Sequence, residues 1–397
     1  MRFKCVALSL TFLFLLTLSL VASAQNPSNI TQIGQLNPSA VYNQAYFGVP
    51  AISPSTIAIA APGSDLDYGG LYVFEKPSTG WGTMTDSSLL YGQACNLGAQ
   101  EAISNDGTVI AATLAGCYGG LGTGGSSIGV FVKPAGGWQY TTTPTATIGD
   151  DFGNYCGYNF ALSSDGSHIA CTDIHGWIHK NFLYFFDKPA SGWTSTGVAT
   201  LSIEVPYVPS NVALYSNLVA VIGSQSGDTN GFVTLYQRTS KGIQQLATLT
   251  ASDGASLCCK IVMDGDTVVV NGYLNSIWSG TAYVFSKPST GWANATETAQ
   301  LTVPNLPNYT YFGYTMSLSN NALLVGGSAT HAAYIFLKPE TGWQTTSTPN
   351  ITLVSNDPNQ ESFGDAVAML GNILVIGDTD EGANDNRNGA AYIYELQ

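Results

Sequence analysis

The stretch Lys76-Pro-Ser-Thr-Gly-Trp81 decides the fold, because its pattern K-P-x-x-G-W returns along the whole chain. Further copies begin at Lys133, Lys188, Lys287 and Lys338, and a degenerate copy, Arg238-Thr-Ser-Lys-Gly-Ile243, fills the gap where another is expected. Proline sets the φ angle that opens a turn, and glycine supplies the left-handed conformation that closes it. Each copy therefore predicts a hairpin loop, with tryptophan starting the next strand and packing in the core.

An aromatic strand precedes each hairpin, as in LYVF (71–74), LYFF (183–186) and AYIF (333–336). These strands recur about every fifty residues, which is the period of a repeat architecture. Two more strands joined by a tight polar turn lie upstream, for example in residues 101–112 and 316–327. A fourth strand follows each hairpin. The unit is thus four antiparallel strands, which repeated radially make a propeller blade.

The last unit ends at Gln397 after its third strand, while the strand at residues 30–36 has no partner near it. Its pattern matches the fourth strands elsewhere, so we expect it to complete the last blade and remove an exposed sheet edge. The prediction is an all-β, seven-bladed β-propeller of four-stranded antiparallel blades. Residues 25–397 should form this single domain, closed by the N-terminal strand.

The first 24 residues predict a signal peptide: a basic start (Met1 to Lys4), an apolar run to Val21, and the small-residue site Ala22-Ser23-Ala24. An uncleaved anchor helix is the alternative. No later stretch has the length and apolarity of a membrane span. We therefore expect a secreted protein, extracellular or periplasmic, that is monomeric and has no membrane span after cleavage.

The chain carries a net charge of −14 with only 10% charged residues. A surface of this sign repels phosphate backbones and anionic lipids, so nucleic acid is not an expected partner.

Six cysteines remain after the predicted cleavage site, an even number that suggests disulfides in an exported chain. Cys95–Cys117 and Cys156–Cys171 would each lie within one unit, although spacing alone leaves the connectivity open. The adjacent Cys258 and Cys259 either form a vicinal disulfide or stay free.

The sequence resembles the FG-GAP repeat family, the integrin α-like propellers, in a bacterial secreted form. The resemblance is carried by Phe47-Gly48, Phe152-Gly153, Phe312-Gly313 and Phe363-Gly364, by Ala61-Pro62-Gly63, and by residues 389–394. Calcium-binding members carry an acidic loop where this chain has short turns, at Ser163–Gly166 and Asp264–Asp266. These turns hold too few carboxylates to enclose calcium. We expect no cofactor.

In such a blade the hairpins and the tight polar turns share one face, and variable loops emerge on the other. Variable loops on a rigid scaffold commonly bind ligands. Aromatic, Asp and Asn side chains in these loops fit recognition of a sugar or peptide, although ordinary solvated loops are the alternative. The candidate ligand-binding residues are Asp65, Asp67, His175, Trp177, His179, Tyr273, Trp278, Tyr309 and Tyr311.

The carboxylates Asp378, Asp380 and Asp385 are candidate metal ligands, but they lack the closing glutamate of a calcium loop, so a solvated loop is favoured. No catalytic motif is present in the chain. We therefore predict a non-catalytic binding or adhesion module for a glycan or an extracellular protein. A carbohydrate-active enzyme of glycosidase or lyase type, or a structural matrix component, is the alternative.

Overall fold

The computed structural model describes residues 29–40, 45–63, 69–91, 97–115, 126–149, 156–175, 180–225, 230–274, 280–307, 309–319, 321–327, 331–355, 362–379 and 388–397. The predicted signal peptide (1–24) lies outside these ranges.

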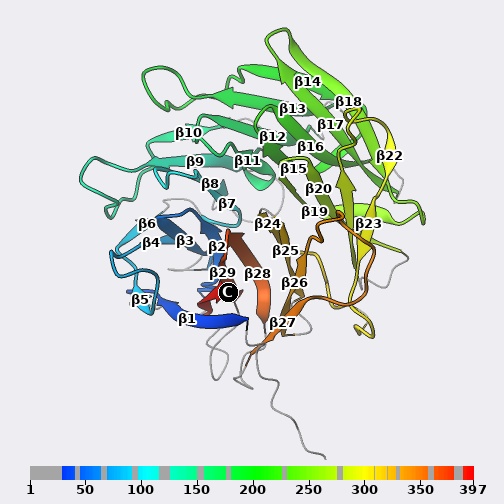
Figure 1. Cartoon of the computed structure of the whole chain (residues 1–397). Coiled ribbons are helices and arrows are strands. Elements are labelled where there is room, and N and C mark those ends of the chain that lie inside the picture. The colour runs from blue at the N-terminus through cyan, green and yellow to red at the C-terminus, as the bar shows by residue number, and fades with distance from the viewer. Residues whose placement is uncertain are drawn as a thin grey trace, which may run out of the picture.

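Seven separate sheets surround one axis, and their four main strands are antiparallel (Figure 1). The inner strands are β2 (Val49–Ile52), β7 (Glu101–Ile103), β11 (Phe160–Leu162), β15 (Val208–Tyr215), β19 (Ser256–Asp264), β24 (Met316–Ser319) and β28 (Phe363–Leu370). The second strands are β3 (Thr56–Ala61), β8 (Val109–Ala115), β12 (His168–His175), β16 (Leu218–Ser224), β20 (Thr267–Tyr273), β25 (Ala322–Gly327) and β29 (Ile373–Asp378). The third strands are β4 (Gly70–Glu75), β9 (Ser126–Val132), β13 (Lys180–Asp187), β17 (Gly231–Thr239), β21 (Thr281–Ser286), β26 (Ala332–Leu337) and β30 (Ala390–Leu396). The outer strands are β6 (Ser88–Tyr91), β10 (Ala146–Ile148), β14 (Leu201–Val205), β18 (Gly242–Thr250), β23 (Ala299–Leu301), β27 (Ile351–Val354) and β1 (Ile30–Asn37). The seven-bladed propeller predicted from the repeats is confirmed, and we number its blades 1 to 7 in chain order.

The N-terminal strand β1 closes the ring by pairing antiparallel with β30, so it forms the outer strand of blade 7. Its register repeats that of other blades. Leu36 lies opposite Ala391, as Leu301 lies opposite Ala282 and Leu353 lies opposite Ala333. The predicted closure is therefore confirmed down to the position of single side chains.

The hydrophobic core consists of seven clusters, and each cluster fills the space between two neighbouring blades. Because both faces of a blade are covered by its neighbours, its central strands are buried along their length instead of alternating between buried and exposed positions. Every residue of β3, β20 and β25 is buried, for example. The Phe-Gly pairs contribute to this core: Phe312 contacts the rings of Tyr334 and Phe336 within its own blade.

The K-P-x-x-G-W hairpins have the predicted turn chemistry. In each, the glycine N–H donates to the proline carbonyl, at 2.9–3.0 Å, and the glycine φ lies between +94° and +100°. Trp138 and Trp193 are buried, and their Nε1–H groups donate to the carbonyls of Gly107 (3.2 Å) and Gly166 (3.0 Å) in the tight turn of the same blade. These two tryptophans therefore connect the hairpin of their blade to its tight turn through a hydrogen bond.

One detail of the hairpin prediction was wrong, because tryptophan does not start the fourth strand. Trp193 precedes β14 by several residues, and the chain between them reaches the neighbouring blade. The residue three positions after each tryptophan forms a parallel bridge to the outer strand of the preceding blade. These bridges pair Leu36 with Met84 in β5 (Met84–Thr85), Leu90 with Thr141, Ile148 with Thr196, Leu249 with Ala295 in β22 (Ala295–Thr296), and Leu301 with Thr346. We call these contacts the rim bridges.

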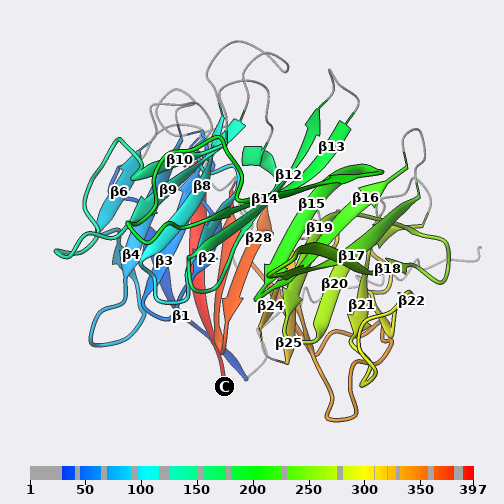
Figure 2. The ribbon, with the colours of Figure 1, turned by 90° about the horizontal axis from the view of Figure 1, so that it is seen from above.

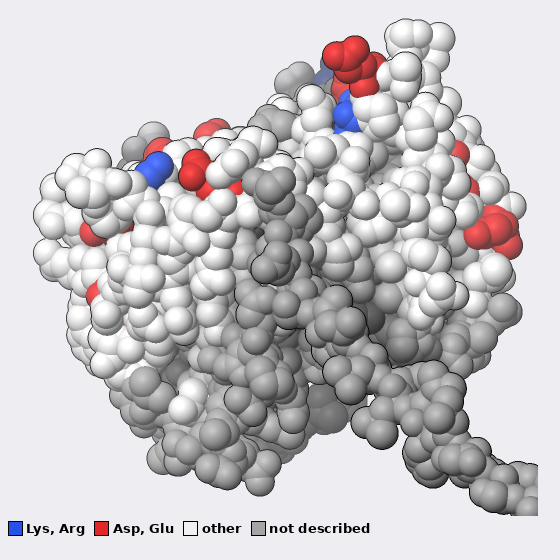
Figure 3. All heavy atoms as spheres, turned by 60° about the horizontal axis from the view of Figure 1, so that its bottom comes forward, with Lys and Arg blue, Asp and Glu red and all other residues white. Residues whose placement is uncertain are grey.

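Figure 2 shows the strands from the side, with the C-terminus at the end of the propeller where the hairpins and tight turns lie. We call this end the turn face and the opposite end the loop face. The described part of the surface seen in Figure 3 carries few charged atoms, and its lysines and arginines lie toward the upper edge of the view. No helix in the described part of the chain has the length and apolarity to span a membrane.

Candidate functional site

The degenerate hairpin of blade 4 borders the site. Without proline, the β17–β18 ladder continues to the pair Thr239 and Gly242, and Ile243 stands where the other hairpins carry tryptophan. In blade 3, the corresponding Trp193 fills the space between blades 2 and 3. Between blades 3 and 4 this large side chain is missing, and a cavity of about 630 Å³ opens there on the turn face. We call this cavity groove A.

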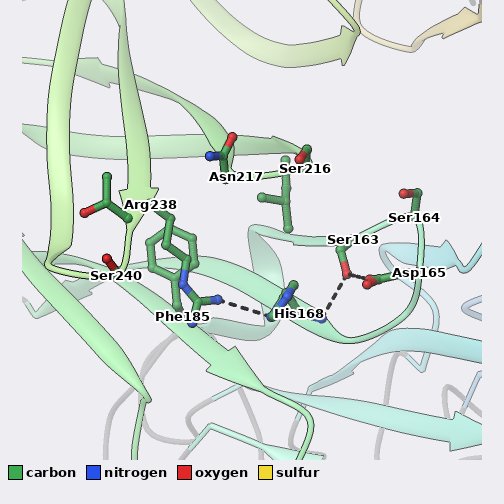
Figure 4. Close-up of a pocket in the computed structure, with 11 residues that line it drawn as sticks. Ser163, Ser164, Asp165, His168, Phe185, Ser216, Asn217, Arg238 and Ser240 are labelled. Atoms are coloured by element: carbon green, nitrogen blue, oxygen red, sulfur yellow. Dashed lines mark hydrogen bonds between the residues drawn. The ribbon is translucent and has the colours of Figure 1, made fainter.

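Groove A is lined by three turns from two blades and by polar side chains in most positions (Figure 4). The lining comprises Ser163, Ser164, Asp165, His168, Phe185, Leu214, Ser216, Asn217, Arg238, Thr239 and Ser240. Its volume lies within the range of small-molecule sites, which is about 300 to 1,000 Å³.

Arg238 anchors the floor of groove A. Its guanidinium lies over the ring of Phe185, 5.6 Å from the centroid. Its two terminal nitrogens bind both carboxylate oxygens of Asp187, a bidentate pair that links blades 3 and 4. His168 Nδ1 lies 2.7 Å from the same carboxylate. Burial acts to raise the pKa of Asp187, but the bonds from Arg238 and His168 outweigh it and hold the pKa below its usual value. Asp187 thus stays ionised and holds both the Arg238 guanidinium and the His168 ring.

The tight turn of blade 3 forms one wall. Ser163 Oγ donates to Asp165 Oδ1 (2.5 Å) and accepts from the His168 backbone N–H (2.9 Å). Burial acts to raise the pKa of Asp165, but hydrogen bonds from Ser163 and Ser167 outweigh it and lower the pKa to about 2. Asp165 is exposed and permanently ionised near neutral pH, so it offers groove A a fixed acceptor.

A second cavity of about 610 Å³, groove B, lies on the other side of the same ridge, between blades 4 and 5. The ridge is the Ser216–Asn217 turn, which lines both grooves and holds Ser216 at a φ of +56°. Trp292 lines groove B together with Leu218 and Leu246. Unlike Trp138 and Trp193, Trp292 is only half-buried. Grooves A and B together form a long surface, with Asp165 and Arg238 in groove A and the ring of Trp292 in groove B.

The structure brings three of the predicted ligand residues to one part of the loop face. Tyr309 and Tyr311 are 56% and 41% exposed, whereas Tyr273 is buried and accepts a hydrogen bond from Asn271. Sequence reasoning missed Tyr314, which is exposed and contacts the ring of Tyr311 at 6.1 Å.

Several other predictions fall on residues that are not described. Asp65, Asp67, Trp177, His179, Trp278, Asp380 and Asp385 lie outside the described ranges, as do Cys95 and Cys117. His175 ends β12, opposite Lys180.

The candidate metal ligand Asp378 is fully buried at the end of β29 and accepts a hydrogen bond from the Ser362 N–H at 3.2 Å. Among the described residues, no three metal-ligating side chains lie together. The predicted disulfide between Cys156 and Cys171 is formed. Of the two alternatives for Cys258 and Cys259, the structure has the free thiols, whose sulfurs lie 2.6 Å apart.

Comparison with known proteins agrees with this architecture. Residues 352–394, which run from the outer strand of blade 6 to the third strand of blade 7, match the FG-GAP repeat. The chain fits an FG-GAP propeller family. No curated protein matches this chain.

Solved structures similar to this chain share its fold at low sequence identity. The WD40 domain of Toxoplasma gondii coronin is 11% identical with a TM-score of 0.58, over 93% of this chain and 87% of that one. Kuenenia stuttgartiensis hydrazine synthase is 13% identical with a TM-score of 0.55, over 89% and 97%. A putative 6-phosphogluconolactonase from Bacteroides fragilis is 16% identical with a TM-score of 0.51, over 80% and 86%. Since these proteins differ widely in function, they support the fold alone.

Proposed function

We propose that this protein is a secreted, non-catalytic binding module that recognises a glycan chain through grooves A and B on its turn face. The observation that supports this most directly is groove A itself, which lies where the repeat loses its tryptophan. The loop-face residues predicted from the sequence are the competing site, and the turn face is favoured because grooves A and B lie there.

The chemistry of the grooves suits a sugar. Hydroxyl and amide groups of Ser216, Asn217 and Ser240 can exchange hydrogen bonds with sugar hydroxyls, and Asp165 is a fixed acceptor. The partly exposed ring of Trp292 offers an apolar face to the C–H side of a sugar ring. Because the Ser216–Asn217 ridge separates the two grooves, the ligand must be long enough to cross it. An oligosaccharide therefore fits better than a single sugar.

The arrangement favours binding over hydrolysis. Groove A holds a serine, a histidine and, beneath it, an aspartate, which are the residue types of a catalytic triad. However, Ser163 Oγ bonds to Asp165 and to a backbone N–H, and His168 turns its Nδ1 to Asp187 and Arg238. No bond joins the serine hydroxyl to the imidazole, so the hydroxyl lacks the base that would activate it.

A glycan array probed with labelled protein (residues 25–397) tests the proposal. The sharpest variant restores the hairpin: residues 238–243 become Lys-Pro-Ser-Thr-Gly-Trp, the sequence that blade 5 carries at 287–292. We expect the new tryptophan to fill groove A and abolish binding in a folded protein. Asn217→Ala should weaken binding without filling the cavity.

The matched control is Tyr309→Ala with Tyr311→Ala on the loop face, which should bind like the wild type. Loss of binding in this control, with normal binding in the groove variants, would move the site to the loop face. A blank array for the wild type would contradict the glycan proposal.

A further inference from the structure

A third cavity of the turn face, which we call groove C, lies at blades 7 and 1, across the ring from blades 3 and 4 (Figure 1). Its volume of about 350 Å³ falls within the range of small-molecule sites, about 300 to 1,000 Å³. Its polar lining includes Lys76 of the blade 1 hairpin, Asn105 of the blade 2 tight turn and Asn372 of the blade 7 tight turn. Among the described residues, no Asp or Glu lines groove C, whereas Asp165 lines groove A and Asp266 lines groove B. Groove C therefore favours a ligand with a negative charge.

An ion pair recurs between neighbouring blades elsewhere on the turn face. Glu75 and Asp187 end the third strands of blades 1 and 3. Each binds the basic residue that opens the hairpin of the next blade: Lys133 pairs with Glu75 at 2.5 Å, and Arg238 pairs with Asp187. In blades 2 and 4, the charge at the first position of the hairpin is thus neutralised by the preceding blade.

Lys76 lacks this ion pair, although blade 7 supplies an acid at the same repeat position. That acid is Glu395, which takes the place in β30 that Glu75 has in β4. Glu395 Oε1 instead accepts a hydrogen bond from Asn372 Nδ2, at 3.1 Å. None of the ion pairs among the described residues includes Lys76, and its side chain is exposed. The ammonium group of Lys76 is therefore available to a ligand in groove C.

Trp81 presents its indole to the same cavity. Trp138 and Trp193 are buried and donate through Nε1–H to the tight turn of their blade. Trp81 is only half-buried and makes no such bond in the described part of the chain. Lys76 Nζ lies 6.0 Å from the centroid of the Trp81 ring. An apolar ring face, an N–H donor and an ammonium group thus lie together in groove C.

We propose that groove C binds a sugar ring that carries a carboxylate, as in a uronic acid. The C–H face of the sugar packs on the Trp81 ring, and the carboxylate accepts hydrogen bonds from the Lys76 ammonium and the Trp81 Nε1–H. The Asn105 amide is placed to bond to a ring hydroxyl. A neutral sugar would leave the ammonium group without a partner. This inference rests on the proposed role of the turn face in glycan binding, but groove C shares no lining residue with grooves A and B.

Saturation-transfer difference NMR of the protein (residues 25–397) tests this site. The probes are D-glucuronate and D-galacturonate, with D-glucose and methyl D-glucuronate as neutral analogues, and with glucose 6-sulfate as a sugar that carries a different anion. We expect saturable binding of at least one uronate, and binding about tenfold weaker or absent for the neutral analogues. Lys76→Met removes the charge and keeps the length of the side chain. It should weaken uronate binding at least about tenfold, because the carboxylate loses a charge-assisted hydrogen bond.

The matched control is Lys188→Met, which removes the exposed hairpin lysine of blade 3, beside the buried Trp193, and should bind uronates as the wild type does. The inference is overturned if uronates bind no better than their neutral analogues, or if glucose 6-sulfate binds more tightly than glucuronate. It is also overturned if Lys76→Met binds as the wild type does, or if Lys188→Met weakens binding equally.

The variant that restores the blade 4 hairpin separates groove C from groove A. It should bind uronates as the wild type does, because groove C is unchanged. If it loses uronate binding while Lys76→Met keeps it, the uronate occupies groove A, so the inference about groove C fails and the proposed function stands. If the glycan array is blank but uronate binding depends on Lys76, groove C stands and the proposal for grooves A and B fails.

Discussion

The closure strand should contribute as much stability as any other outer strand. Leu36 is 1% exposed and lies between blades 7 and 1, where it belongs to the cluster of Phe47, Ile59 and Ile393. Leu36→Ala deletes three carbon groups, worth about 0.8 kcal/mol each in transfer free energy. A cavity term adds to this loss, because the neighbouring blades relax only in part. We expect a loss of about 3 kcal/mol in the free energy of unfolding.

The same calculation applies to Leu301 and Leu353, which are 1% and 0% exposed at the same register position in blades 5 and 6. Urea unfolding at 25 °C, followed by tryptophan fluorescence, measures all three alanine variants. With a slope of about 3 kcal/mol per molar urea, each midpoint should fall by about 1 M. Thr31→Ala, on the exposed side of β1, is the control and should change little.

The reasoning is refuted if Leu36→Ala unfolds like the control while Leu301→Ala and Leu353→Ala lose stability. That result would mean that β1 is detached in solution and that blade 7 stands with three strands.

Further predictions follow from single contacts. Trp193→Phe removes the hydrogen bond to the Gly166 carbonyl. Its free energy of unfolding in urea should fall by about 1 kcal/mol more than that of Trp343→Phe, because the buried Nε1 of Trp343 has no hydrogen-bond partner to lose. Equal losses would contradict this. Gly34→Ala should destabilise the closure, because its Cβ would lie 2.2 Å from the Gly82 carbonyl carbon; an unchanged urea midpoint would show that the backbones move apart freely. Asp165 has its pKa lowered to about 2, so it stabilises the fold above its unfolded pKa of about 3.9 and loses this effect as pH falls toward 2. Asp165→Asn should therefore lower the urea midpoint at pH 6 more than at pH 2.5, and an equal loss at both would exclude the charge as the cause. The shared hydrogen bond lowers the pKa of Cys259 and raises that of Cys258, so iodoacetamide followed by peptide mass spectrometry should label Cys259 first, and the reverse order would contradict this.

The propeller and its closure could be predicted because each repeat contains residues that favour a particular turn by their own backbone preferences. Pro77 and Gly80 each fix a backbone angle, and such signals need no knowledge of distant residues. The rim bridges were not predictable in this way. They pair Thr141 with Leu90 through backbone groups, and backbone pairing places no demand on side-chain identity.

The residues predicted for the candidate site lie in aromatic loops, whereas groove A lies at the gap in the repeat. The signal was present in the sequence, because Ile243 replaces a tryptophan and Arg238 replaces a lysine that precedes proline. A missing large side chain between packed blades predicts a cavity.

The pairing of β1 with β30 also determines how the molecule responds to force. Ile30 lies opposite Leu396, and the Gln397 N–H donates to the Asn29 carbonyl, so both chain ends leave the same end of one antiparallel ladder. A force that pulls the two termini apart would break these hydrogen bonds one after another and separate β1 from β30. A pull between one terminus and a ligand in the proposed grooves would instead load the strands of several blades at once. A tether at a single end would therefore let the propeller bear tension while bound.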